Sequence, residues 1–436
     1  MTMKEGVSWR SANSLSVMVP THKQRIRHIV IGNPTNRRVQ FFQQALSRFG
    51  LESATVVPYI DLLKGTCSLD KTIELLTNNK CNGNAGSGVF LRIESPGEDF
   101  DVERQLIARG DGLINSRSKP AAISRHAALR LRQDHGRIAY PAQWLAGYSS
   151  LLSVVSATTG RFPHLKQYNN VEDILVMFHK PTCYRRLESA NVSLPNALFD
   201  VESFDDLRER MRVLNWKRVF VKLASGSSAS GVIALYMNGE TMRAVTSMET
   251  VGSGARSRFY NNLKLRVYHR EKEIRPAIEF LCRETAHIEQ WLPKAHQSGR
   301  NFDLRIVAIE GKPRHVVVRT SHSPVTNLHL GNRRGDSDQL KQDVGQPKWQ
   351  SVLDTAGRAA REFPNTICVG LDVLLQPGFR IPTILEANAF GDLLPGVTHQ
   401  GLNTYEAQIA TIVSSTGVRP AWRFIYSDLG HGNESG

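Results

Sequence analysis

Apolar and polar residues follow two different periods along this chain, and the periods predict where strands and helices lie. Residues 27–34 form an apolar run that ends in a turn, which predicts a buried strand. Residues 36–49 have apolar side chains at helical spacing, and Gly50 follows as a stop signal. Strands are again predicted at residues 53–59 and 88–93. Because strand, helix and strand alternate, we expect a parallel α/β unit here.

The rest of the chain shows helices first and then paired strands. Residues 116–165 predict helix and loop, and helices are expected at 171–178, 180–190 and 203–214. Short apolar runs predict strands at 218–223, 233–236, 301–309, 315–320, 370–375 and 384–389.

Composition narrows the class of protein. A chain of 436 residues suggests two or three domains, and 41% hydrophobic with 22% charged residues is typical of a globular enzyme. No apolar stretch approaches a membrane span, so no membrane partner is expected. The five cysteines are scattered without a CxxC pair, which favours a reducing, cytoplasmic location over a zinc or disulfide framework.

The net charge of +15 has several interpretations. The densest basic group lies between Arg256 and Arg275. Such charge can indicate nucleic acid, an acidic substrate or a plain basic surface. Because no nucleic-acid-binding module is recognisable, we expect a basic surface for most of it and no nucleic-acid partner.

Oxygen-bearing side chains near the C-terminus predict a metal site. Asp372 lies within an apolar strand, and Glu386 and Asn388 are two residues apart on the next. Residues two apart on a strand point to one face, and such hard oxygen donors suit Mg²⁺, which usually also binds phosphate. The alternative is a pair of solvated or ion-paired carboxylates.

A small-residue loop follows Lys222 and could contact phosphate through backbone N–H groups and hydroxyls. It lacks the Walker A pattern, and a flexible hairpin is the alternative. Its candidate residues are Gly226, Ser227, Ser228, Ser230 and Gly231.

Two further features concern a nucleotide. The connector Glu289, Gln290, Trp291 and Leu292 could form an adenine slot, although an ordinary strand exit is the alternative. Arg305 and Arg319 lie in otherwise apolar strands, and buried arginines need an anionic partner. Phosphate or an acyl-phosphate transition state could supply it.

The order and spacing of these elements resemble the ATP-grasp superfamily over residues 175–425. The runs Asp303-Leu304-Arg305 and Asn327-Leu328-His329-Leu330-Gly331 are similar to those of RimK-type ligases. The resemblance implies an α/β (α+β ATP-grasp) fold in which a parallel α/β pre-ATP-grasp domain precedes a two-lobed ATP-grasp domain. The expected segments are a tail (1–24), the first domain (25–174), a lid and central lobe (175–292), a C-terminal lobe (293–425) and a tail (426–436).

The resemblance also implies a role for each candidate residue. Lys180 and Lys222 would hold the α and β phosphates, and the loop would close over the γ phosphate. Glu289 to Leu292 would bind adenine and the ribose edge, with Asp303 also on the nucleotide side. Arg319, Arg305 and Asn327 would be catalytic, and Asp372, Glu386 and Asn388 would hold Mg²⁺.

The expected function is an ATP- and Mg²⁺-dependent ligase that activates a carboxylate as an acyl phosphate and joins it to an amine of an amino acid or peptide. An ATP-grasp kinase is one alternative, since fold analogy cannot separate the two. A basic nucleic-acid-binding or scaffold protein with a vestigial nucleotide site is another. The segment 238–286 is longer than a compact family member needs and is basic, which makes an acidic peptide or protein a candidate substrate.

Overall fold

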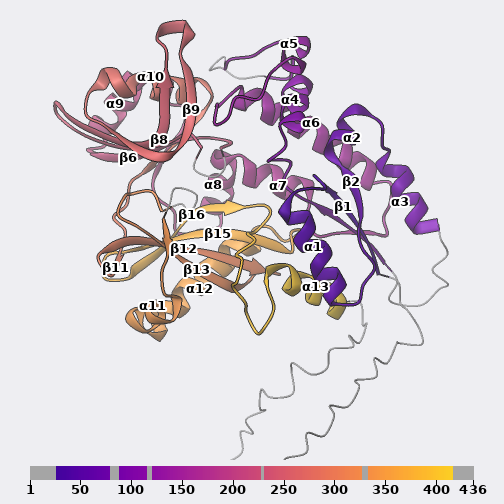
Figure 1. Cartoon of the computed structure of the whole chain (residues 1–436). Coiled ribbons are helices and arrows are strands. Elements are labelled where there is room, and N and C mark those ends of the chain that lie inside the picture. Colours follow the sequence, from indigo (N-terminus) through magenta and orange to yellow (C-terminus); the bar gives the residue numbers. More distant parts are fainter. Residues whose placement is uncertain (1–25, 79–87, 115–119, 227–229, 327–331, 416–436) are drawn as a thin grey trace, which may run out of the picture.

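The first part of the chain forms a parallel sheet. The structure is a computed structural model that describes residues 26–78, 88–114, 120–226, 230–326 and 332–415. Four strands pair in the order β2-β1-β3-β4, all parallel (Figure 1). They are β1 (Ile26–Gly32), β2 (Thr55–Pro58), β3 (Gly88–Ile93) and β4 (Leu165–Gln167). The predicted parallel α/β unit is therefore confirmed.

Helices surround this sheet, and the first one shows why the sequence forms it. In α1 (Arg37–Arg48), the Asn36 side chain caps the N-terminus by accepting from the Arg38 N–H, and Val39, Phe42 and Leu46 form the buried face. The other helices of this part are α2 (Tyr59–Lys64), α3 (Leu69–Asn78), α4 (Phe100–Arg109), α5 (Arg125–Leu129), α6 (Pro141–Thr159) and α7 (Val171–Phe178).

The middle of the chain forms an antiparallel lobe, seen at the upper left of Figure 1. Its strand order is β5-β10-β6-β7-β8-β9. Helices α9 (Phe204–Val213) and α10 (Glu271–Arg283) pack on this sheet and share a hydrophobic core with it. The strands are β5 (Ala197–Leu198), β6 (Arg218–Leu223), β7 (Val232–Asn238), β8 (Thr241–Val251), β9 (Arg258–Tyr268) and β10 (Ala286–Gln290), with a 3-10 turn η1 (Gly254–Arg256).

The last part forms a second antiparallel sheet in the order β14-β13-β12-β15-β16, with β11 paired to β12. One face is apolar and packs on α12, while the other carries the polar residues described below. The strands are β11 (His296–Gln297), β12 (Arg300–Ile309), β13 (Lys312–Ser321), β14 (Arg333–Arg334), β15 (Cys368–Gln376) and β16 (Arg380–Asn388). The helices of this last part are α11 (Ser337–Val344), α12 (Gln346–Arg361) and α13 (Thr404–Ser415). One further helix, α8 (Lys180–Ser189), comes earlier in the chain, just before the middle lobe.

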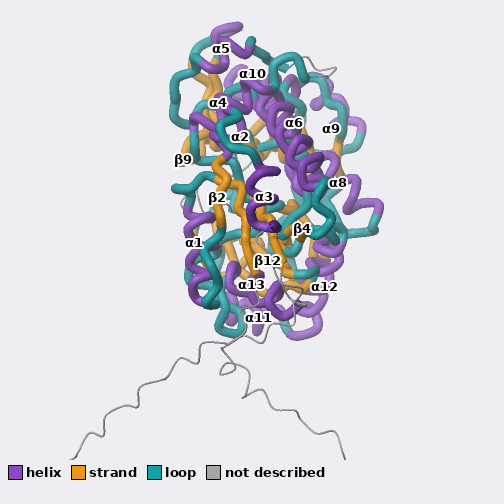
Figure 2. The backbone as a smooth tube through the Cα atoms, turned by 90° about the vertical axis from the view of Figure 1, so that its right-hand side faces the viewer, coloured by secondary structure: helices purple, strands orange, loops and turns teal. Residues whose placement is uncertain are grey.

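The first and third sheets share one hydrophobic core, whereas the middle lobe has its own. The C-terminal helix α13 returns to pack against α1 at the other end of the chain (Figures 1 and 2). The expected fold class, a parallel α/β domain followed by two antiparallel lobes, is thus confirmed. Across the described residues, every helix is too short or too polar to span a bilayer.

Candidate functional site

Strand register places the predicted metal-binding side chains on one face of the third sheet. Asp372 on β15 lies directly opposite Glu386 on β16, and Gly370 lies opposite Asn388. Opposed residues on paired strands share a face, so the three side chains line one stretch of the β15–β16 pair. The Asn388 amide donates to the Gly370 carbonyl at 3.4 Å. That contact uses the nitrogen, so the amide oxygen is the atom that suits a metal ion.

The same face continues as a row of charges across four strands. Arg305 on β12 is opposite Asp372, and Asp303 on β12 is opposite Arg319 on β13. Arg305 Nε lies 2.7 Å from Asp372 Oδ1, although the two are not aligned as a hydrogen bond. Both atoms are buried and without any other hydrogen bond. A buried carboxylate oxygen that accepts no hydrogen bond fits a hard cation, so these residues are compatible with Mg²⁺.

In the described part of the chain, no three or more His, Cys, Asp and Glu side chains group in a way that could hold a metal ion. The predicted set contains two carboxylates and one amide, so it does not contradict this result. Magnesium is typically held by one or two carboxylates, waters and substrate phosphate, so this donor set is sufficient only together with a phosphate ligand.

Lys180, at the start of α8, joins the small-residue loop to the predicted metal ligands. Its Nζ donates to the Gly226 carbonyl at 2.6 Å and to Glu386 Oε1 at 2.9 Å. Burial by itself would raise the pKa of Glu386, but Lys180 and Lys222 outweigh burial and hold this pKa below its ordinary value. The carboxylate is therefore ionised, as a metal ligand must be.

Lys222, near the end of β6, pairs with Glu289 on the neighbouring strand β10. Its Nζ lies 2.5 Å from Glu289 Oε2, and His287 Nε2 lies 2.9 Å from Oε1. Burial alone would raise the pKa of Glu289, but Lys222 and His287 lower it to about 2. Burial also disfavours the charged form of Lys222, yet Glu289 and Glu386 leave its pKa raised. Both groups are thus charged at neutral pH.

A cleft lies where α8, β10 and β16 meet. The empty space between its walls is about 350 Å³, a figure that includes open solvent at its mouth. Lys180, Glu289 and Glu386 are on its wall, together with apolar side chains from α8 and β16. Polar groups converging in a mostly apolar cleft are typical of small-molecule sites.

The remaining connector residues lie outside this cleft lining. The Trp291 ring contacts Phe220 and the Arg218 guanidinium. The backbone N–H groups of Gln290 and Trp291 donate to the carbonyls of Asn196 and Arg218. An adenine-binding role for Gln290, Trp291 and Leu292 stays a prediction. It would have to use groups other than the backbone N–H groups of Gln290 and Trp291.

The loop after β6 is described only at its ends. The Gly226 carbonyl accepts a hydrogen bond from Lys180. Gly231 has a φ of +64°, and a Cβ added there would lie 2.7 Å from the Leu223 side chain. The loop joins two antiparallel strands, because Lys222 pairs with Val232 across it, and its predicted contact with phosphate stays a prediction. Ser230 is the first described residue after the undescribed part of the loop. The predicted residues Ser227, Ser228 and Asn327 lie outside the described residues, so their roles stay predictions.

Arg305 and Arg319 both have the anionic partner that the sequence analysis required, although in the structure that partner is not phosphate. Arg319 Nε donates to Asp303 Oδ1 at 2.8 Å, and its Nη2 lies 3.0 Å from Asp372 Oδ2. The required anionic partners are thus carboxylates of the chain itself. Burial would lower the pKa of Arg319, but Asp303 and Asp372 raise it instead.

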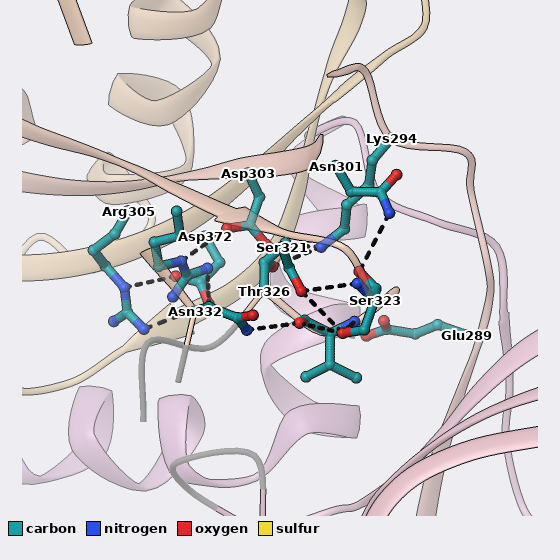
Figure 3. A network of polar contacts seen from close by, with 12 residues as sticks. Glu289, Lys294, Asn301, Asp303, Arg305, Ser321, Ser323, Thr326, Asn332 and Asp372 are labelled. Atoms are coloured by element: carbon teal, nitrogen blue, oxygen red, sulfur yellow. Dashed lines mark hydrogen bonds and ion pairs between the residues drawn. The ribbon is translucent and has the colours of Figure 1, made fainter. Parts of the chain in front are cut away.

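Three site residues were missed by the sequence analysis. Lys294 donates to Asp303 Oδ2 at 2.9 Å and to Thr326 Oγ1 at 2.7 Å (Figure 3). Asp392 lies 3.7 Å from Arg305 Nε. One feature of the sequence could have identified Lys294. It lies directly after the apolar connector and before a strand, which is where two lobes join.

Comparisons with known proteins give a mixed result. No protein-family model matches the chain. No curated protein matches it.

Several solved structures are similar in overall shape. The ATP-grasp ligase PsnB, complexed with minimal precursor, Mg and ADP, has a TM-score of 0.46 and 13% identity, covering 91% of this chain and 100% of that chain. The macrocyclase MdnC, bound with precursor peptide MdnA from Microcystis aeruginosa MRC, has a TM-score of 0.47 and 12% identity over 89% and 99% of the two chains. A D-alanine–D-alanine ligase from Bacillus anthracis, complexed with ATP, has a TM-score of 0.45 and 12% identity over 90% and 97%. Scores and identities this low do not assign an activity.

Proposed function

We propose that this chain is an ATP- and magnesium-dependent ligase of the RimK-like kind, which activates a carboxylate as an acyl phosphate and joins it to an amine. One observation carries the proposal. Lys180 contacts the Gly226 carbonyl in the small-residue loop and Glu386 in the predicted metal set, at 2.6 and 2.9 Å. A single ammonium group therefore lies between the two elements that would hold phosphate and metal.

The proposed reaction has two steps. A substrate carboxylate oxygen attacks the γ-phosphorus of ATP, the bond from that phosphorus to the bridging oxygen breaks, and ADP leaves with the electron pair. An amine nitrogen then attacks the acyl carbon, the carbon–oxygen bond to phosphate breaks, and the amine proton leaves with the phosphate. Such chemistry depends mainly on positioning and on neutralising charge.

The chain's residues divide that task. We assign Lys180 and Lys222 to the α and β phosphates of ATP, and Arg319 and Arg305 to the transferring phosphoryl group. We assign the side chains of Asp372, Glu386 and Asn388 to Mg²⁺, which would neutralise phosphate charge when bound. In the structure these opposite charges pair with one another, and phosphate and metal would take the place of partners in these pairs.

For the second substrate, we assign the basic hairpin β8–β9 to an acidic peptide or protein. Arg266 is paired with Glu249 at 2.6 Å and Arg270 with Glu273 at 2.9 Å, so these two charges are largely neutralised. Arg258 and Lys264 are exposed on β9 and supply the attraction that we propose. Exposed charge of this kind steers encounter more than it adds affinity.

The test is ADP release screened over amino acids and peptides, with mass spectrometry of the product. We expect release that needs Mg²⁺ and a product joined through an amide. In Glu386→Gln, loss of one metal-binding charge removes several kcal/mol of transition-state stabilisation, so we expect release to fall by ~100-fold or more.

Asp354→Asn is the matched control, because Asp354 is an exposed carboxylate on α12 of the same lobe. It should release ADP at the wild-type rate. Normal turnover in Glu386→Gln would contradict the metal assignment. A stable phosphorylated product in place of an amide would identify a kinase and refute the ligase proposal.

A further inference from the structure

A row of buried charges extends from the connector between the two lobes to the predicted metal set. Lys294 follows the connector after β10, and Asp303 and Arg319 face each other on β12 and β13. Asp372 comes next on β15. Lys294, Asp303, Arg319 and Asp372 are all buried, and their charges alternate in sign along the row. Figure 3 shows Lys294 at one end of this network and Arg305 at the other.

Within this row, the two oxygens of Asp303 are divided between different partners. Oδ1 accepts from Arg319 Nε at 2.8 Å. Oδ2 accepts from Lys294 Nζ at 2.9 Å and from the Thr326 hydroxyl. Lys294 also donates to Thr326 at 2.7 Å, which closes a three-membered ring of contacts around Oδ2.

This division determines how Arg319 is held. Arginine and carboxylate commonly pair through two parallel hydrogen bonds, one to each oxygen. Here Lys294 and Thr326 occupy Oδ2, so Arg319 has only Oδ1 of Asp303 available. Its Nη2 is left for Asp372 Oδ2, at 3.0 Å. The guanidinium therefore connects Asp303 to the predicted metal ligand.

Removing Lys294 would change that arrangement. Oδ2 would keep the Thr326 hydroxyl but lose its charged partner, which is costly for a buried carboxylate, and the other cation that pairs with Asp303 is the Arg319 guanidinium. Arg319 would then turn to hold both oxygens of Asp303 and would withdraw Nη2 from Asp372.

We propose that Lys294, together with Thr326, is a positioning pair for Arg319: it blocks Oδ2 of Asp303 so that the guanidinium stays at Asp372, where the γ phosphate of ATP is bound. The inference rests on the proposed function, which assigns Arg319 to that phosphate. Lys294 itself is buried behind Asp303 and acts through Arg319.

A purely structural ion pair would behave differently. Its loss would loosen the sheet and weaken every nucleotide to a similar degree. A positioning role affects only the phosphate that Arg319 reaches, so it changes the preference for ATP over ADP. The ratio of the two dissociation constants therefore separates the two roles.

The experiment is calorimetry of wild type and Lys294→Met with Mg²⁺ and either ADP or a non-hydrolysable ATP analogue. We expect Lys294→Met to bind ADP within about twofold of wild type. It should bind the analogue ~10-fold more weakly, the size of effect expected from one charge-assisted hydrogen bond. Lys312→Met is the matched control, because Lys312 is exposed at the other end of the same strand pair and should preserve the wild-type ratio.

Thr326→Val is an independent variant, because it removes the hydroxyl from Asp303 Oδ2 while every charge remains. It should shift the ratio in the same direction by a smaller factor, and it decides the question if Lys294→Met does not fold. Equal weakening of both nucleotides in the variant that folds would overturn the positioning role. Absence of nucleotide binding in the wild type would instead refute the proposed function, and this inference with it.

Discussion

At the scale of single residues, Glu289 shows how the site holds a charge in a buried position. Only 3% of Glu289 is exposed, and both its oxygens are used, one by Lys222 and one by His287. The two partners outweigh the cost of burial and lower the pKa of the carboxyl from 4.5 to about 2. A pKa that differs between the folded and unfolded states makes stability depend on pH.

The sign of this dependence follows from the direction of the shift. The folded pKa is depressed, so the stabilisation is complete above pH 4.5 and is lost as pH falls toward 2. A shift of this size corresponds to on the order of 3 kcal/mol. We therefore expect Glu289→Gln to be less stable than wild type at neutral pH by about that amount, and the difference to shrink below pH 4.5.

Urea unfolding over a series of pH values measures the difference. Glu240→Gln is the control, because Glu240 is exposed in the turn between β7 and β8, and its difference from wild type should not vary with pH. A gap between wild type and Glu289→Gln that stays constant through the acid range would show that Lys222 and His287 do not stabilise the ionised carboxylate.

Single residues also show what the sequence could reveal about the site. An arginine in an apolar strand needs an anionic partner, and here Arg305 pairs with Asp372 while Arg319 pairs with both Asp303 and Asp372. Which anion it finds depends on strand register, because Asp303 is opposite Arg319 only once β12 and β13 are paired. Lys294 could not be assigned in this way, since its partner Thr326 meets it only through the folded sheet.

At the scale of elements, α4 and α6 pack closely against each other in the first domain. A Cβ at Gly147 would lie 1.9 Å from the Leu106 carbonyl oxygen, and one at Gly110 would lie 2.0 Å from the Gln143 carbonyl oxygen. Glycine inside a helix costs about 1 kcal/mol relative to alanine, so its presence at Gly147 indicates a gain elsewhere. That gain is the close approach of the two helix backbones.

We expect Gly147→Ala to destabilise the protein. The substitution improves helix propensity by about 1 kcal/mol, but the added methyl group must push α6 away from α4. Overpacking of a dense interior costs about 1–3 kcal/mol and can cost more when backbone atoms are in the way. We predict a net loss of about 2 kcal/mol or more in the free energy of unfolding, measured by urea denaturation.

Ser153→Ala is the matched control, since Ser153 lies on the exposed face of α6 and its substitution improves propensity without a clash. It should be neutral or slightly stabilising. A stable Gly147→Ala would mean that α6 can move at little cost. The sequence predicted helix in this region correctly, but the close contact depends on a helix from another part of the chain, which the pattern of one segment does not contain.

At the scale of the whole molecule, the middle lobe is attached to the first part of the chain by more than the connecting backbone. The segment 134–138 lies antiparallel to β9, with the Asn261 N–H donating to the Gly136 carbonyl at 2.6 Å and the Ile138 N–H to the Phe259 carbonyl at 2.8 Å. Tyr260 adds a hydrogen bond to Asp134 at 2.9 Å. We call this segment the strap, and it lengthens the sheet of the middle lobe by one short partner.

The strap also explains why domain organisation was only partly visible in the sequence. The strands predicted from local periodicity are found in the structure, but β8 and β9 lie in a segment for which no strand was predicted, and the order of strands within each sheet is not contained in that periodicity. The strap has no apolar periodicity, because it pairs through backbone atoms, and α13 joins α1 from the opposite end of the chain. Both connections depend on how the finished parts meet.

Gly136 makes the strap testable. Its φ is +79°, and a Cβ there would lie 2.7 Å from the Asn261 carbonyl oxygen, so alanine meets both conformational strain and a backbone clash. Gly112 is a matched control, with a φ of +73° and nothing within 4 Å of an added Cβ. Both Ala variants share the strain of about 1 kcal/mol, and only Gly136→Ala also separates the strap from β9.

Hydrogen exchange reports the separation directly. In Gly136→Ala we expect the Ile138 and Asn261 amides to lose protection by ~10-fold or more relative to Gly112→Ala, because their hydrogen bonds join the strap to β9. Protection in the strands β6 and β10, which lie farther inside the same sheet, should be equal in the two variants. If both variants exchange alike at Ile138 and Asn261, the strap does not hold the middle lobe. If β6 and β10 also lose protection in Gly136→Ala alone, the strap supports the folding of the whole lobe and is more than an attachment at its edge.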